Sequence, residues 1–355
     1  MDYISIGSKI NRTIFHEGME FLYFSGTSYL GMGSLPEFEE LIVAGIRQYG
    51  FSYGSSRSGN VQLAIYDQME EYFASQTGAE KATIMSSGFL SGYVTASVLQ
   101  SFAHEVWVAP DTHPAILPEG LRPDPNQDYS QFRENCMEAS HNTEGKTIAI
   151  LANAVDPLTP YIHDFNWIRN LSQKNTYYLL LDDSHAFGLV GKSIFGTYSQ
   201  WKNLPVHLVI SGSLGKALGI SAGIILGSAQ FIHKITSNPI YIGASPPSPG
   251  FCKAFLDAQH LYLLQQAKLN LNMKYFYSLI KDWRGLKYEF QFPVLTFSRP
   301  GHADKLKEMQ LLISSFPYPC PNDMPLERII LSAFHEKNDL DKLWNGIKKV
   351  SLLSC

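Results

Sequence analysis

Short runs of apolar and β-branched residues recur through the middle of the chain, and each run ends in a polar or glycine-containing turn. Such runs are typical of strands buried on both faces of a parallel sheet. Stretches long enough for helices separate several of them, for example residues 165–175. The pattern therefore predicts an α/β fold with strands at 82–85, 106–109, 147–151, 177–181, 208–210 and 224–226.

The C-terminal part of the chain, from about residue 286, shows a different pattern. Strand-like and helix-like segments alternate there, at 288–297, 303–315, 328–334 and 340–350, which predicts a small α+β domain. A helical stretch over 251–281 joins it to the sheet. We predict an N-terminal arm and linker at 1–45, a large domain at 46–250, and a connecting helix with the small domain at 251–355.

Composition and charge narrow the function classes. The chain has 355 residues, 45% of them hydrophobic, and a formal net charge of −4, so it lacks the basic footprint of a nucleic-acid-binding protein. Its 4 cysteines are scattered without the spacing of a disulfide framework or a metal site, which favours a reducing cytoplasm. No stretch is apolar enough for a leader or a membrane span, so we expect neither targeting nor membrane association.

In open parallel sheets, ligand-binding groups gather beyond the carboxyl ends of the strands. The run 82–85 leads into Ser87, Gly88 and Phe89, where a turn and a helix N-terminus could bind a phosphate, although an ordinary strand-to-helix turn has the same pattern. The run 177–181 leads into Asp182, a carboxylate that needs a partner beside a buried strand. That partner could be a protonated ring nitrogen of a cofactor, or either Asp182 or Asp183 could simply cap the following turn.

The run 208–210 leads into a glycine-rich segment that contains a single lysine, Lys216. An amine among small residues can be partly desolvated, which lowers its pKa and favours Schiff-base chemistry. Most lysines are simply solvated surface residues, so this signal is weak by itself. His113 and Arg328 are candidates of the same kind, each weak alone.

Several motifs follow one another in a fixed order. They are Ser28-Tyr29-Leu30-Gly31, the glycine-rich stretch 54–60 with Gln68-Met69-Glu70 after it, Ser87-Gly88-Phe89, Asp111-Thr112-His113, Asp182-Asp183-Ser184-His185 and Ser213-Leu214-Gly215-Lys216. In this order and spacing they resemble the α-oxoamine synthase family of pyridoxal 5′-phosphate (PLP) enzymes. The resemblance runs from about residue 24 to 335. The aspartate-to-histidine motif and the lysine motif carry most of its specificity.

The resemblance implies a fold type I aminotransferase architecture, with a large, mostly parallel, seven-stranded domain and a small C-terminal domain. It implies that Lys216 forms the internal aldimine with PLP, that Asp182 pairs with the pyridine nitrogen, and that His113 stacks on the ring. His185 would hydrogen-bond near the phenolic oxygen. The phosphate would be held by Ser87, Gly88, Phe89 and Ser213, and by Ser245 in the segment that reaches a neighbouring subunit.

For the substrates, the resemblance implies that Arg328 binds the amino-acid carboxylate, with Ser28 in the substrate site. It predicts a homodimer, with active sites at the interface, that condenses an amino acid with an acyl-CoA thioester through an external aldimine and a quinonoid, usually with decarboxylation. The arm before Ser28 is short, and residues 152–159 lack the family's Ser-Met-Asp-Gly stretch. These departures leave two alternatives open: an aminotransferase or related carbanion chemistry without CoA, and a cofactor-binding protein without catalysis.

Overall fold

The computed structural model describes residues 4–317 and 323–352. The chain divides into two compact units. The larger unit comprises Glu40–Asp156 and His163–Ala258, and the smaller unit comprises Met1–Glu39, Pro157–Ile162 and Gln259–Cys355. The predicted N-terminal arm, up to Glu39, thus belongs to the same unit as the C-terminal part of the chain. Helix α1 (Pro36–Tyr49) begins in that unit and continues into the larger one.

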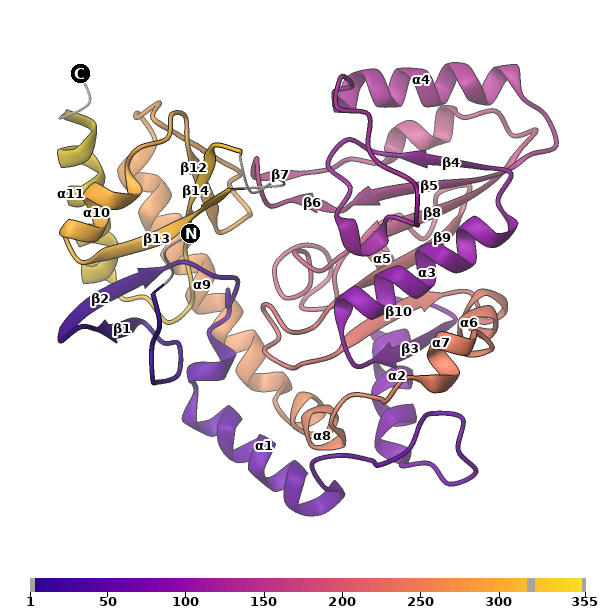
Figure 1. The fold of residues 1–355 in the computed structure, drawn as a ribbon, viewed down its shortest axis with the longest axis horizontal. Helices are drawn as coiled ribbons and strands as arrows, with labels where there is room; N and C mark the ends of the chain where they lie inside the picture. The colour runs from indigo at the N-terminus through magenta and orange to yellow at the C-terminus, as the bar shows by residue number, and fades with distance from the viewer. Residues whose placement is uncertain (1–3, 318–322, 353–355) are drawn as a thin grey trace. The chain divides into compact units, whose positions relative to one another are not determined.

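A six-stranded sheet forms the centre of the larger unit (Figure 1). Its strands lie in the order β3 (Lys81–Met85), β10 (Gly223–Gly227), β9 (His207–Ser213), β8 (Thr176–Asp182), β5 (Thr147–Asn153) and β4 (Glu105–Val108). The last four of these pair in parallel, whereas β10 is antiparallel to both of its neighbours. All six strands predicted from the sequence are confirmed, and the sheet has six strands in place of the seven that the resemblance implies.

The apolar runs form strands here because both faces of the sheet are covered. Leu179, Leu180 and Leu181 of β8 are completely buried, and fully burying a leucine side chain contributes about 2 kcal/mol. Helix α3 (Gly88–Phe102) crosses the near face of the sheet in Figure 1, and its Val94 and Leu99 join the core formed by the strands. The other helices of this unit are α2 (Ala64–Thr77), α4 (Tyr129–Asn142), α5 (Tyr198–Trp201), α6 (Ala229–Thr236), α7 (Pro239–Gly243) and α8 (Pro249–Asp257).

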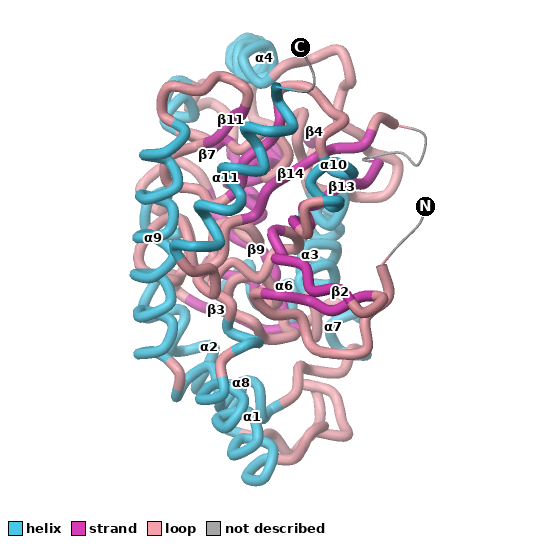
Figure 2. Tube along the Cα trace, turned by 90° about the vertical axis from the view of Figure 1, so that its left-hand side faces the viewer, coloured by secondary structure: helices cyan, strands magenta, loops and turns pink. Residues whose placement is uncertain are grey.

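The smaller unit contains a second six-stranded sheet. Its strands lie in the order β1 (Thr13–His16), β2 (Met19–Phe24), β13 (Leu311–Pro317), β14 (Pro325–Ile330), β12 (Val294–Phe297) and β11 (Leu286–Tyr288). Helices α9 (Gln259–Ile280) and α11 (Lys337–Leu352) pack side by side in this unit (Figure 2). N-terminal and C-terminal segments therefore share one sheet, because β2 pairs in parallel with β13.

The side chain of His335 contacts the last two residues of β2 within the smaller unit. The His335 ring, buried and stacked on Phe24, lies with Nε2 2.9 Å from the carbonyl oxygen of Tyr23. Its Nδ1 accepts a hydrogen bond from the backbone N–H of Ser332 at 3.0 Å. This imidazole is therefore the tautomer protonated at Nε2, and both of its nitrogens are used.

Several sequence-based elements differ from the structure. Residues 165–175 form only a short 3₁₀ helix, Asn166–Asn170, because the chain then turns so that the N–H of Ser172 donates to Ser140 Oγ. The helix predicted over 303–315 ends early: α10 is Ala303–Glu308, Gln310 takes a positive φ of 60°, and the following residues join β13. The strand predicted over 288–297 is instead the pair β11 and β12.

Both helical predictions for this part of the chain are confirmed, since the stretch over 251–281 corresponds to α8 and α9, and the helix over 340–350 to α11. The strand predicted over 328–334 is only partly correct, because β14 ends at Ile330 and residues 331–334 form no strand. Short elements complete the fold: the 3₁₀ turns Met32–Ser34 and Pro114–Ile116, and the two-residue strands β6 (Val155–Asp156) and β7 (Tyr161–Ile162). Within the described ranges, no helix has the length and apolar character of a membrane span.

Candidate active site

Asp182 is the last residue of β8 and the centre of the candidate site. Its side chain is only 7% exposed, and Oδ1 accepts a hydrogen bond from the backbone N–H of Ser184 at 2.7 Å. The turn-capping interpretation is thus confirmed for Oδ1, while the other oxygen, Oδ2, lies 4.0 Å from Nδ1 of His113. The pairing of Asp182 with a cofactor ring nitrogen stays a prediction. A carboxylate at this depth, with one oxygen not used by the turn, suits a cationic partner.

Lys216 lies in the loop between β9 and β10, which is compact because Leu214 and Ala222 hydrogen-bond across its base. The Lys216 amine is partly buried, and Nζ lies 2.8 Å from Nε2 of His185. The same turn that carries His185 is bonded to β9, because Ser184 Oγ accepts from the backbone N–H of Ser213 at 2.8 Å. The amine and the imidazole are therefore held together from two adjacent strand ends.

His113 follows β4 and caps the 3₁₀ turn at 114–116. Its Nδ1 accepts from the backbone N–H of Ala115 at 3.1 Å, which fixes the ring in the tautomer protonated at Nε2. Burial lowers the pKa of His113, the Asp182 carboxylate opposes that effect, and the Lys216 cation reinforces it. Because the pKa of His113 is lowered overall, its imidazole is neutral at pH 7. A neutral imidazole is suited to packing flat against an aromatic ring.

The turn after β3 places the N-terminus of α3 against the end of β9. Ser87 caps the helix, since its side chain accepts from the backbone N–H of Leu90 at 3.2 Å. Gly88 has to be a glycine, because a Cβ there would lie 2.4 Å from Cβ of Ser213. This contact brings the helix N-terminus beside Ser213, whose Oγ accepts from the N–H of Gly215 at 3.2 Å. Phe89, the next residue, is 58% exposed.

The structure thus brings together eight predicted residues, Lys216, Asp182, His113, His185, Ser87, Gly88, Phe89 and Ser213, on one edge of one sheet. Ser245 lies after α7 in the same unit and is exposed. Arg328 and Ser28 belong to the smaller unit. There the Arg328 side chain is buried against the ring of Phe316, with Nη1 donating to the carbonyl oxygen of Pro157 at 3.2 Å. The predicted substrate-binding roles of Arg328 and Ser28 stay predictions.

Two further residues of this region had no role in the sequence-based site. Asn153 ends β5 and is in register with Asp182, so its side chain lies on the same sheet edge. Asp183 is completely buried and accepts hydrogen bonds from the N–H and the hydroxyl of Thr197, and burial raises its pKa to about 7. Asn153, like Asp182, is a polar residue at the end of a buried apolar run. That pattern in the sequence was enough to mark Asn153 as a candidate.

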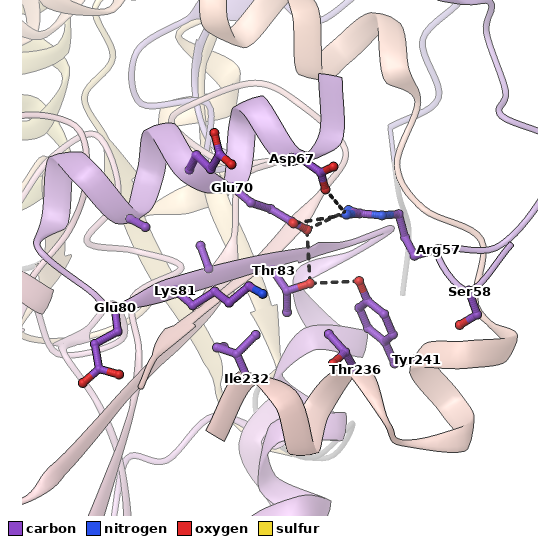
Figure 3. Close-up of a pocket in the computed structure, with 13 residues that line it drawn as sticks. Arg57, Ser58, Asp67, Glu70, Glu80, Lys81, Thr83, Ile232, Thr236 and Tyr241 are labelled. Atoms are coloured by element: carbon purple, nitrogen blue, oxygen red, sulfur yellow. Dashed lines mark hydrogen bonds and ion pairs between the residues drawn. The ribbon is translucent and has the colours of Figure 1, made fainter. Parts of the chain in front are cut away.

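A polar cavity of about 520 Å³ lies elsewhere in the larger unit (Figure 3). Arg57 is its central cation, donating to Glu70 at 2.7 Å and to Asp67 at 2.8 Å, while Thr83 links Glu70 to Tyr241. This pairing joins the glycine-rich stretch to the Gln68-Met69-Glu70 segment that follows it. The cavity lies next to Lys81, the first residue of β3, whereas the Ser87 turn follows the last residue of that strand. None of the predicted site residues lines the cavity. It is therefore not the candidate active site.

Comparison with known proteins identifies the family. The family model for class I and II aminotransferases matches residues 152–341, more than half of the chain. The chain belongs to the class I and II aminotransferase family. The match begins at the end of β5 and includes the Asp182 and Lys216 motifs.

Curated relatives in this family cover nearly the whole chain. One is an 8-amino-7-oxononanoate synthase of Saccharophagus degradans, 24% identical over 97% of this chain and 90% of its own length. Another is an 8-amino-7-oxononanoate synthase of Buchnera aphidicola, 24% identical over 98% of this chain and 93% of its own length. These relatives confirm the resemblance to the α-oxoamine synthases.

Solved structures confirm the fold. A serine palmitoyltransferase of Sphingomonas wittichii superposes with a TM-score of 0.80 at 16% identity, covering 98% of this chain and 91% of the other. An 8-amino-7-oxononanoate synthase of Francisella tularensis superposes with a TM-score of 0.72 at 20% identity, covering 94% of this chain and 99% of the other. The predicted α/β architecture of fold type I is therefore correct.

The residues of the site fit PLP, the cofactor that the resemblance predicts. An amine beside an imidazole suits an aldehyde, a buried carboxylate suits a protonated ring nitrogen, and a helix N-terminus beside a serine suits a phosphate. The close contact between Gly88 and Ser213 places this helix N-terminus directly beside the serine.

Proposed function

We propose that this chain is a PLP-dependent acyltransferase of the α-oxoamine synthase type, which joins an amino acid to the acyl group of an acyl-CoA thioester, usually with loss of carbon dioxide. The observation that carries the proposal is the 2.8 Å contact between Lys216 Nζ and His185 Nε2, on the same sheet edge as Asp182 and His113. Full-length relatives named 8-amino-7-oxononanoate synthase favour acyl transfer over transamination.

Lys216 would hold the cofactor covalently, Asp182 would hold its ring-nitrogen proton, and His113 would pack against the ring. PLP, when bound, supplies an electron-withdrawing ring that stabilises negative charge at the substrate's α-carbon. Once the amino group of the substrate has displaced it from the cofactor, the free Lys216 amine would act as the base: it would take the proton from the α-carbon and later return one. His185 supports this step, because its Nε2 hydrogen-bonds the amine and fixes where Nζ points.

Substrate binding is assigned to the smaller unit. Arg328 would bind the amino-acid carboxylate, since a guanidinium is permanently charged and pairs with a carboxylate through two parallel hydrogen bonds. Its position on a strand buried in the sheet, rather than on a surface loop, would hold that pairing in one geometry. Ser28 would contribute beside it.

The assembly and location are further parts of the proposal. We propose a cytoplasmic homodimer in which Ser245 contacts the cofactor phosphate of the neighbouring subunit. The exposed position of Ser245 after α7 is compatible with the contact to a neighbouring subunit. The free, buried cysteines Cys136 and Cys252 suit the reducing conditions of the cytoplasm.

Thiol release tests the reaction. The PLP-loaded protein is mixed with glycine, alanine or serine and an acyl-CoA, and free CoA is measured with a thiol reagent while the visible absorption of the cofactor is recorded. The proposal expects an amino acid to change the spectrum, and expects thiol release only when both substrates are present. Keto-acid formation without thiol release would show an aminotransferase instead, and a spectrum that no amino acid changes would show a protein that binds the cofactor without catalysis.

A further inference from the structure

Asn153 makes an unusual connection for a side chain at a strand end. Its Oδ1 accepts from the backbone N–H of His113 at 3.1 Å, and its Nδ2 donates to the backbone carbonyl of Asp111. The side chain is buried, and both ends of the amide are used. Only one orientation of the amide satisfies both contacts, because the N–H needs an acceptor and the carbonyl needs a donor.

The segment that Asn153 holds is fixed from other directions as well. Thr112 Oγ1 lies 2.7 Å from the carbonyl oxygen of Ala109 and 3.0 Å from that of Leu151 on β5. The carboxylate of Asp111 lies 2.6 Å from Nε2 of His163, whose ring stacks on Tyr129 at a centroid distance of 4.1 Å. The backbone on either side of Thr112 is thus attached to β5, and the loop ends with His113.

We propose that Asn153 is the positioning residue that sets the imidazole of His113 against Asp182, and that this is its contribution to cofactor binding. The role of His113 rests on the proposed function, whereas the role of Asn153 rests on the hydrogen bonds of this structure. Asn153 and Asp182 are paired neighbours in the sheet, so one strand pair fixes both the carboxylate and the amide that holds the imidazole. The distance of 4.0 Å between His113 Nδ1 and Asp182 Oδ2 is the geometry that this arrangement maintains.

An aspartate could not replace the asparagine. Its carboxylate could still accept from the N–H of His113, but its second oxygen would face the carbonyl oxygen of Asp111 with no proton between them. It would also add a negative charge beside Asp182, the residue that pairs with position 153 on the neighbouring strand β8. The asparagine is therefore required for its donor as well as for its acceptor.

Asn175 provides a matched control on the same sheet. It precedes β8, at the end opposite to Asp182, where its Nδ2 donates to the carbonyls of Ser140 and Thr143 and its Oδ1 accepts from the N–H of Lys146. Asn175→Ala removes side-chain to backbone hydrogen bonds of the same kind without touching the site. A purely structural role for Asn153 would make the two alanine variants behave alike.

The experiment uses full-length protein and the variants Asn153→Ala, Asn153→Asp and Asn175→Ala. PLP affinity is measured by absorbance titration, with unfolding free energy measured in parallel. We expect both Asn153 variants to bind PLP about 10-fold or more weakly, the loss that about 1.4 kcal/mol represents, and Asn175→Ala to stay within about twofold of wild type. Affinity within about twofold for Asn153→Ala, or an equal loss in Asn175→Ala, overturns the proposal.

A second readout needs no cofactor. The ring of His113 is titrated by NMR in cofactor-free protein with labelled histidine, and its signal is assigned by its loss in His113→Gln. Releasing the loop should move the pKa of His113 up toward its ordinary value in Asn153→Ala and leave it unchanged in Asn175→Ala. An unchanged titration in Asn153→Ala refutes the positioning role. If wild type does not bind PLP, the proposed function fails, while this titration still decides whether Asn153 positions His113.

Discussion

The buried His335 should make the protein lose stability in weak acid. Burial lowers the pKa of His335 from its ordinary 6.5 to about 4. Protonating Nδ1 would also break the hydrogen bond that it accepts from Ser332, so the folded protein holds this ring neutral. The unfolded chain binds the proton below pH 6.5, whereas the folded chain binds it only near pH 4. The stability contributed by the neutral ring is therefore complete above pH 6.5 and is lost as the pH falls from 6.5 to about 4.

The size of this effect follows from the two pKa values. The gap between 6.5 and about 4, at roughly 1.36 kcal/mol for each pH unit, corresponds to about 3 kcal/mol in the free energy of unfolding. That is a large share of the roughly 5–15 kcal/mol that stabilises an ordinary domain. Acidification to pH 4 should therefore lower the stability of the smaller unit in particular.

Denaturant unfolding of wild type and His335→Gln across this pH range isolates the contribution. Other titrating groups act equally in both proteins and cancel in the difference. We expect wild type to be the more stable protein at pH 7, and the difference between the two to shrink by about 3 kcal/mol on going to pH 4. A difference that stays constant from pH 7 to pH 4 would refute the reasoning, because it would mean that His335 titrates alike in the folded and unfolded chains.

Four other changes test the site and the fold. Lys216→Ala should fold normally and lose the borohydride-reducible link to PLP seen by mass spectrometry; a retained link would show that another amine carries the cofactor. Gly88→Ala should cost about 1–3 kcal/mol in unfolding free energy and weaken PLP binding, because its Cβ meets the end of β9; unchanged PLP affinity would separate this turn from the phosphate site. Arg328→Ala should raise the KM for the amino acid by about 10-fold or more and leave PLP affinity unchanged, in steady-state and absorbance assays; an unchanged KM would contradict its carboxylate role. Glu70→Ala should destabilise the protein by about 3–5 kcal/mol in denaturant unfolding, since it leaves the buried Arg57 cation without its main partner; a loss under about 1 kcal/mol would mean that Arg57 finds another partner.

Elements that the sequence predicts correctly are those whose signal is local. The central strands of the larger unit, β5, β8, β9 and β10, are buried on both faces, so their apolar runs could be identified directly, as the run before Asp182 illustrates. The helix predicted over 303–315 fails for the opposite reason. Leu311 and Ile313 fit a helical pattern, but the chain reverses at Gln310 and the residues pair with β2. No local property reveals that partner, because β2 lies near the other end of the sequence.

In the candidate site, too, local sequence signals were readable and long-range contacts were not. Lys216, Asp182 and His113 each end or follow an apolar run, so the rule that ligand-binding groups lie at strand ends marked them as candidates, and the family resemblance then gave them roles. Asn153 obeys that rule too, yet its role depends on which backbone groups its amide reaches, and these lie in a loop about 40 residues away in the chain. Asp183 was hidden by its neighbour Asp182, because the sequence does not show which of two adjacent carboxylates turns into the core toward Thr197.

The antiparallel direction of β10 limits how this protein can change. Because β10 returns directly beside β9, the lysine loop is a closed hairpin whose two stems are registered at Ser213 and Gly223, and Gly223 is registered in turn with Met85 at the Ser87 turn. A residue inserted into that hairpin would displace the amine and the helix N-terminus together, so length variation there should be eliminated by selection. The connection at 119–127 has no buried residue and carries no such constraint, and we expect new substrate contacts to evolve in loops of that kind while the hairpin keeps its length.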